Sequence, residues 1–199
     1  MGVRVPPSAP HLRFPCQSWQ QIPGSLSQIA VGFGGNVWGL NAAGQIWHFN
    51  PATQGWKQIS GSLAQIAVGA DGTVWGLNSA GQIFRYDPQA SGAWDSIPGA
   101  LTQIAVGSAN NVWGINAAGQ VFRYDSKLQS WDSIPGILTS LAVAFDGTVW
   151  GLNSAQQVWR FNAQTQGWDS IAGQMSEISV GADAVVWGVN ASGQTYEYW

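Results

Sequence analysis

The sequence has little charge and few of the side chains that catalysis or metal binding needs. Only 9% of its 199 residues are charged, against roughly 25% in an average soluble domain, and seven basic residues offer no electrostatic footprint for nucleic acid. A single cysteine, Cys16, excludes an internal disulfide and a cysteine-based metal cluster. The two histidines, His11 and His48, assemble no catalytic triad, and no pair of carboxylates stands out. We therefore expect no enzyme activity, no cofactor, no metal and no nucleic-acid partner.

Long apolar runs are also absent. No run approaches the ~18 residues of a membrane helix, and the first residues lack the apolar stretch of a signal peptide. We therefore expect no membrane insertion, and a protein that is cytoplasmic or secreted by a route not visible in the sequence. Residues 1–18 are rich in proline and match nothing else in the chain, which predicts a disordered or non-native tail.

Tryptophan, in contrast, is abundant and regularly spaced. Thirteen occur, and two series of five recur every 37 or 38 residues, which indicates five copies of one unit over residues 19–199. The first series, in the motif VWG, comprises Trp38, Trp75, Trp113, Trp150 and Trp187. The second series comprises Trp19, Trp56, Trp94, Trp131 and Trp168.

Each unit predicts four short strands, of the types WxxI, QIAVG, VWGLN and QIFRY, separated by turn residues such as Asp-Gly and NSAG. No stretch shows helical periodicity, so the fold class is all-β. A four-stranded unit repeated about every 37 residues is typical of a β-propeller blade. Because IAVG is apolar or small throughout, we expect it to form an inner strand covered on both faces.

The phase of the repeat predicts how the propeller closes. The chain begins on an outer strand, residues 19–22, and ends on the last inner-triplet strand, residues 194–198. If the first outer strand completes the last blade, the result is a closed ring without an exposed sheet edge. We therefore expect a five-bladed β-propeller of four-stranded antiparallel blades, closed by the N-terminal strand.

Paired substitutions support this strand register. Each unit with Arg in its fourth predicted strand has Asp at the opposed position of the next outer strand. The pairs are Arg85–Asp95, Arg123–Asp132 and Arg160–Asp169. Where Arg is replaced by His48, the opposed residue is Lys57, and across the expected closure Glu197 would face Gln20. Arg and Asp thus occur together or not at all.

The unit W-x-x-I-x-G-x-L-x-Q-I-A-V-G-x-x-G-x-V-W-G-x-N-x-x-G-Q-I-x-R-Y resembles the tectonin repeat of tectonins and tachylectin-type lectins. The resemblance covers residues 19–199 and rests on IAVG, VWG-x-N and W-x-x-I-x-G at fixed offsets. It implies a non-enzymatic β-propeller lectin of innate defence that binds glycans, methylated sugars or lipopolysaccharide among them, between blades or in their loops. Tectonin propellers usually have six blades. Either this ring has five, as the strand phase favours, or a sixth blade is missing.

Two sets of residues are candidates for carbohydrate binding. The fourth predicted strand carries an aromatic residue in every unit, whose ring could stack on a sugar or pack between blades. These aromatic residues are Trp47, Phe84, Phe122, Trp159 and Tyr196. An asparagine closes the third predicted strand, where its amide could bind sugar hydroxyls or initiate the turn. These asparagines are Asn41, Asn78, Asn116, Asn153 and Asn190.

The sequence thus predicts a monomeric lectin with repeated weak sites that act by avidity on clustered glycans. The alternative is a protein-interaction scaffold with no sugar ligand, because propellers host many unrelated functions. The near-identical turns NAAG, NSAG, NAAG, NSAQ and NASG favour the lectin, since a scaffold normally varies its loops. Gln156 replaces the turn glycine in the fourth unit, so we expect a site there to differ.

Overall fold

The structure is a computed structural model that describes residues 19–89, 93–181 and 185–198. Antiparallel β-sheet dominates these residues, and one short 3-10 turn, η1 (Phe33–Gly35), interrupts it. The expectation of an all-β chain is therefore confirmed. The tail expected over residues 1–18 lies outside the described residues.

The described residues form five antiparallel sheets, each made of strands that are consecutive in the chain. The first sheet contains β1 (Gln28–Val31), β2 (Val37–Leu40), β3 (Gln45–Asn50) and β4 (Gly55–Ser62). The second contains β5 (Gln65–Val68), β6 (Val74–Leu77), β7 (Gln82–Asp87) and β8 (Ala93–Ala100). The third contains β9 (Gln103–Ser108), β10 (Asn111–Ile115), β11 (Gln120–Asp125) and β12 (Ser130–Ile137).

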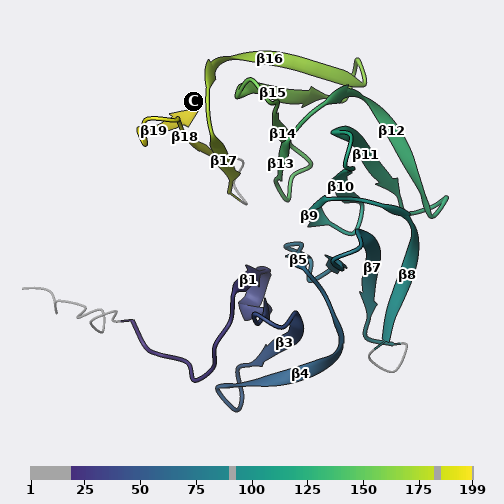
Figure 1. Ribbon diagram of the computed structural model, residues 1–199, viewed down its shortest axis with the longest axis vertical. Helices are drawn as coiled ribbons and strands as arrows, with labels where there is room; N and C mark the ends of the chain where they lie inside the picture. The colour runs from purple at the N-terminus through teal and green to yellow at the C-terminus, as the bar shows by residue number, and fades with distance from the viewer. Residues whose placement is uncertain (1–18, 90–92, 182–184, 199) are drawn as a thin grey trace, which may run out of the picture.

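The fourth sheet contains β13 (Ser140–Val143), β14 (Val149–Leu152), β15 (Gln157–Asn162) and β16 (Gly167–Gln174). The fifth contains β17 (Glu177–Val180), β18 (Val186–Val189) and β19 (Thr195–Tyr198). The sheets stand side by side in an arc, with the first strand of each toward a common centre (Figure 1). In the four sheets that have a fourth strand, this long strand is outermost. This is the arrangement of propeller blades.

The strand register agrees with the paired substitutions in the sequence. Arg85 lies opposite Asp95 in the β7–β8 pair, and His48 lies opposite Lys57 in the β3–β4 pair. The other two expected pairs, Arg123–Asp132 and Arg160–Asp169, are opposed in the same way. Arg85 and Asp95 also form an ion pair with an N–O distance of 2.9 Å. The predicted register is therefore confirmed.

Neighbouring sheets are joined by a tryptophan from the VWG motif of one and an aromatic ring of the next. The first four VWG tryptophans are 1–2% exposed, and each meets the ring of the following sheet edge-on. The ring pairs are Trp38–Tyr86, Trp75–Tyr124, Trp113–Phe161 and Trp150–Tyr198, with centroids 4.7–4.9 Å apart. The core therefore lies between the sheets, in successive clusters, rather than within any one of them.

The second strand of a sheet, rather than the first, is the most buried. All four residues of β6 and of β14 are buried, whereas β5 is buried only at Ile66. The expectation of an inner strand covered on both faces is confirmed for β5, because Ile66 belongs to the cluster shared with the first sheet and Ala67 packs against the cluster shared with the third. Its residues stay only half-buried where this strand borders the central space. Val31, Val68, Val106, Val143 and Val180 line that space.

A glutamine bridges three of the sheet junctions. The Gln28 side chain donates to the Ile66 carbonyl and accepts from the Ile66 N–H, both at 3.2 Å. Gln65 and Gln103 make the same pair of bonds to Ile104 and Leu141. The equivalent positions in β13 and β17 are Ser140 and Glu177. Each bridge satisfies an edge-strand peptide group that would otherwise have no β-ladder partner.

The described residues do not form the expected ring closure. The fifth sheet has three strands, and residues 19–22 form no strand and pair with none of the described sheets. Trp187 is 50% exposed on the fifth sheet and Ile29 is 60% exposed on the first, so these two sheets do not cover one another. The repeat phase fixes the strand order within a sheet, but closure also requires a curvature that brings the first and fifth sheets together.

Replacing equivalent tryptophans should distinguish a complete junction from an uncovered one. Trp113→Ala should lower the free energy of unfolding by about 3–5 kcal/mol, because it removes a large side chain from a closed cluster. Trp187→Ala should cost less than about 2 kcal/mol, because half of that side chain is already in water. Urea unfolding followed by circular dichroism measures both. Equal losses would show that the fifth sheet is covered as fully as the third.

Candidate functional site

The turns between the second and third strands are built in the same way in all five sheets. The Asn41 Oδ1 atom accepts from the N–H groups of Ala43 and Gln45, and its amide donates to Gln45 Oε1 at 2.7 Å. Asn78, Asn116, Asn153 and Asn190 make the same three bonds. The candidate asparagines thus hold the turns, and in the first four sheets each keeps one further amide N–H that a ligand can bind.

The turn needs a residue with positive φ at its fourth position. Gly44 has a φ of 74°, and a Cβ there would lie 2.8 Å from the Leu63 carbonyl oxygen. Gln156 occupies this position in the fourth sheet with a φ of 61°, and its N–H still donates to the Asn153 carbonyl at 2.9 Å. The turn is therefore kept where the glycine is lost, at the cost of left-handed backbone strain.

Restoring the glycine should relieve this strain. Gln156→Gly should raise the free energy of unfolding by about 0.5–1 kcal/mol, the left-handed penalty less the extra entropy of glycine in the unfolded chain. Gln157→Gly, one residue into strand β15, should destabilise instead. Guanidinium unfolding of both variants provides the comparison, and a destabilised Gln156→Gly protein would contradict the assignment of strain.

Two hollows lie between successive asparagine turns, and we call them the junction hollows. The face of the arc that carries these turns is called the asparagine-turn end. The first, of about 470 Å³, is lined by Gln28, Leu40, Asn41, Gly44, Leu63 and Ala64, among others. The second, of about 400 Å³, is lined by Gln65, Leu77, Asn78, Gly81, Leu101 and Thr102, among others. Each residue of the second set occupies the repeat position of its counterpart in the first. Asn78 and Ser79 border both hollows, so one turn serves two sites.

The candidate aromatic residues lie elsewhere. Phe84, Phe122 and Trp159 pack against the clusters between sheets, and Trp47 is half-buried on β3. Tyr196 is the exception, because it is 44% exposed. Its hydroxyl accepts from the Asn190 amide at 3.4 Å and donates to Gln194 Oε1 at 3.3 Å, so the two candidate sets meet in the fifth sheet.

A larger groove, of about 590 Å³, lies on the other face of the arc, where the first three sheets meet. This face is called the opposite end. On the first sheet, the His48 and Trp38 rings are stacked with centroids 4.4 Å apart. Asn36 Oδ1 lies 3.0 Å from His48 Nε2 and accepts from Trp38 Nε1 at 2.9 Å. Asp71, Arg85 and other residues of the second sheet complete the groove. This groove could not be predicted from the sequence, because it depends on the spacing of three sheets.

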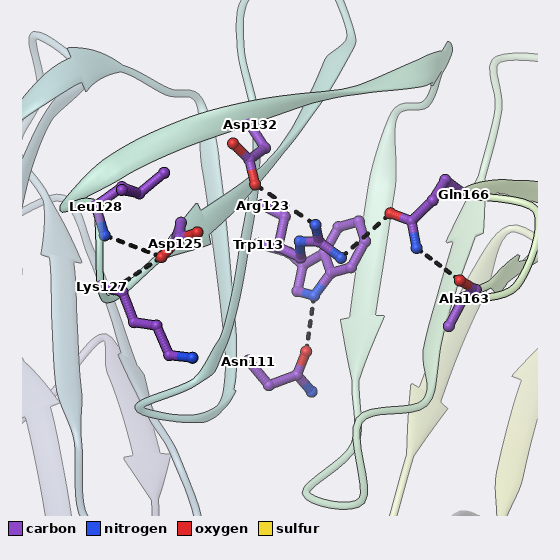
Figure 2. Close-up of polar contacts among 9 residues, drawn as sticks. All are labelled: Asn111, Trp113, Arg123, Asp125, Lys127, Leu128, Asp132, Ala163 and Gln166. Atoms are coloured by element: carbon purple, nitrogen blue, oxygen red, sulfur yellow. Dashed lines mark hydrogen bonds and ion pairs between the residues drawn. The ribbon is translucent and has the colours of Figure 1, made fainter.

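The equivalent position of the third sheet carries an arginine instead of a histidine. The Arg123 guanidinium lies over the Trp113 ring at 5.9 Å and donates to Asp132 and to Gln166 of the next sheet (Figure 2). Trp113 Nε1 donates to Asn111 Oδ1 at 2.7 Å, as Trp38 does to Asn36. The first-sheet groove thus has a distinct chemistry although it is built from the same repeat.

Two ionisable groups at this end have shifted pKa values. Burial, and secondarily the charge of Lys57, lower the pKa of His48 below its ordinary value. Backbone N–H groups of Leu128 and Lys127 donate to Asp125 and lower the pKa of its carboxyl (Figure 2). The lowered pKa means that His48 favours the neutral form at neutral pH.

Acidification should destabilise the protein through His48. A lowered folded-state pKa means that the unfolded chain binds the proton more readily, so stability is present above the unfolded pKa of about 6.5 and is lost as the pH falls below it. The melting temperature of the native protein should fall more between about pH 7.5 and pH 5 than that of His48→Gln. An equal fall in melting temperature for the two proteins would contradict this contribution of His48 to stability.

The described residues contain no group of three His, Cys, Asp or Glu side chains arranged to hold a metal ion. Within that part of the chain, no helix is long and apolar enough to cross a membrane.

A family model described as the tectonin domain matches residues 8–93 and 89–199. The chain belongs to the tectonin-domain family. No curated protein matches this tectonin-domain chain. A crystal structure of human WBSCR16 is similar, with 10% identity and a TM-score of 0.63 over 83% of this chain and 58% of that one. A structure of YCF48 bound to D1 peptide has 12% identity and a TM-score of 0.64 over 89% of this chain and 67% of that one. At such identities these likenesses concern the propeller fold alone.

Proposed function

We propose that this tectonin-domain chain is a lectin that binds glycans through repeated weak sites at the asparagine-turn end. The repetition of the junction hollows carries the proposal, because the same lining residues recur at successive sheet junctions. A surface of this kind suits a ligand that is itself repeated. The activity that we propose is binding without chemistry.

The lining of a junction hollow suits a partly methylated sugar. The remaining amide N–H of Asn41 can donate to a hydroxyl oxygen, and Ser62 can donate or accept. Leu40 and Leu63 offer apolar surface to C–H faces and O-methyl groups. Each hollow is shallow, so single-site affinity is low, and simultaneous engagement of several sites on a clustered glycan, such as lipopolysaccharide, raises it.

Blocking the hollows tests this proposal without breaking the turns. Ala43 and Ala80 are exposed turn residues that line the first and second hollows, respectively. The double variant Ala43→Arg, Ala80→Arg should weaken binding to a glycan array containing methylated hexoses and lipopolysaccharide by about tenfold or more, because avidity multiplies the loss of single sites. Ala52→Arg, in the exposed β3–β4 turn at the opposite end, is the matched control for size and charge and should bind normally.

Two outcomes would contradict the proposal. Undiminished binding by the double variant would exclude the junction hollows as the sites. Equal affinity of the native protein for monovalent and multivalent forms of one sugar would exclude avidity.

The second candidate is a protein-interaction scaffold, and the groove at the opposite end favours it. This groove combines the stacked His48 and Trp38 rings with Arg85 and the carboxylates of Asp71 and Asp87. Such a mixture of charge and aromatic surface suits a peptide side chain, and a similar structure, that of YCF48, is bound to a peptide. A folded protein that binds no glycan on the array would favour this function.

A further inference from the structure

The fifth sheet ends at an unpaired edge. Among the described residues, β19 pairs only with β18, whereas each of the other four sheets has a fourth strand beyond its third. Tyr196 and Tyr198 on this edge are 44% and 43% exposed, and Trp187 on β18 is 50% exposed. An edge strand of this kind is a template for the backbone of another extended segment.

The fourth strand of a complete sheet places a tryptophan against the preceding sheet. Trp94 lies 6.2 Å from the Trp38 ring and donates its indole N–H to the Ser60 carbonyl at 3.1 Å. Trp168 lies 6.1 Å from Trp113 and donates to the Pro135 carbonyl at 2.8 Å. A glycine beside each carbonyl, Gly61 or Gly136, leaves room for the indole.

The junction between the fourth and fifth sheets has the receiving half of this arrangement. Ala172 and Gly173 occupy the repeat positions of Pro135 and Gly136. A pocket of about 170 Å³ lies there, lined by Trp150, Ile171, Ala172, Met175 and Tyr198, among others. A Cβ on Gly173 would meet only the Met175 methyl group, at 3.7 Å, where a Cβ on Gly136 would meet an indole. The pocket therefore has the shape and the carbonyl acceptor for a tryptophan.

Residues 19–22 carry the one W-x-x-I copy among the described residues that belongs to no sheet. Trp19 is fully exposed. In complete sheets the tryptophan lies opposite the aromatic residue of the third strand, as in Phe49–Trp56 and Phe161–Trp168. The same register places Trp19 opposite Tyr198 and Gln20 opposite Glu197.

The N-terminal segment of the same chain lies across the opening of the arc from this edge (Figure 1). Its anchor on the first sheet is the one that the other connections use, because the Ser27 N–H donates to the Leu40 carbonyl as the Ala64 N–H does to the Leu77 carbonyl, both at 2.7 Å. The strand before Ala64, β4, pairs in the preceding sheet, so this anchor is compatible with strand pairing by residues 19–22. A second molecule can bring this segment to β19 without closing the opening between the first and fifth sheets.

We propose that the edge of the fifth sheet is a docking site for residues 19–22 of a second copy of this chain. The donated segment pairs with β19 and inserts Trp19 into the 170 Å³ pocket beside Trp150. There its indole N–H donates to the Ala172 carbonyl. Reciprocal donation gives a symmetric strand-exchanged dimer, in place of the monomer expected from the sequence. The dimer places the asparagine turns of two chains in one particle.

Disulfide trapping between two full-length proteins tests the exchange. Both carry Cys16→Ser, one carries Gln20→Cys with an affinity tag, and the other carries Glu197→Cys. Mild oxidation should link them into a heterodimer, because the register places positions 20 and 197 opposite one another. Gln58→Cys, on the exposed outer strand β4, replaces Gln20→Cys in the matched control and should not link to Glu197→Cys.

Sedimentation equilibrium then tests the tryptophan. Trp19→Ala should weaken the dimer by about tenfold or more, Trp19→Phe should retain most of the affinity, and Gln21→Ala should leave it unchanged. A chain with both Gln20→Cys and Glu197→Cys that links only within itself would overturn the proposal and show that the ring closes within one molecule. A dimer that is insensitive to Trp19→Ala, or the absence of a linked heterodimer, would also overturn it.

Discussion

The contact between a buried tryptophan of one sheet and an aromatic ring of the next is the interaction on which the rest of this structure depends. An isolated four-stranded sheet cannot bury its own VWG tryptophan, so each sheet is stable only beside a neighbour. Because the ring separation is nearly constant, the sheets are evenly spaced. The asparagine turns at their ends are therefore evenly spaced too, and the junction hollows arise from that spacing rather than from any dedicated loop.

The same interaction makes the first and fifth sheets different from the three sheets between them. Trp187 has no following sheet among the described residues, and Ile29 has no preceding one, so surface that is buried at the inner junctions is exposed here. The junction hollows and the exposed surfaces of the first and fifth sheets thus have one origin. A repeat that builds identical sites also builds terminal surfaces that remain to be covered, which is the reason that terminal repeats of such proteins are usually atypical.

Much of the fold could be predicted from the sequence because the repeat encodes local pairing. The paired occurrence of Arg85 and Asp95 in the sequence predicts the hairpin register, and the structure has that register. Closure could not be predicted in this way, because curvature depends on small angles between sheets and not on strand order. For the site, the position of Asn41 was predictable from turn chemistry. The contribution of Leu63 was not, because it comes from the connection to the next sheet and becomes visible only when two sheets are side by side.

We propose that one repeat creates several equivalent binding sites. The most direct test of this proposal is the number of ligand molecules that one chain binds, measured by native mass spectrometry with a monovalent O-methylated glycoside chosen from the glycan array. We predict two or more bound molecules per chain with similar affinities, because the hollows at successive junctions are lined by equivalent residues. Saturation at a single molecule per chain would contradict it.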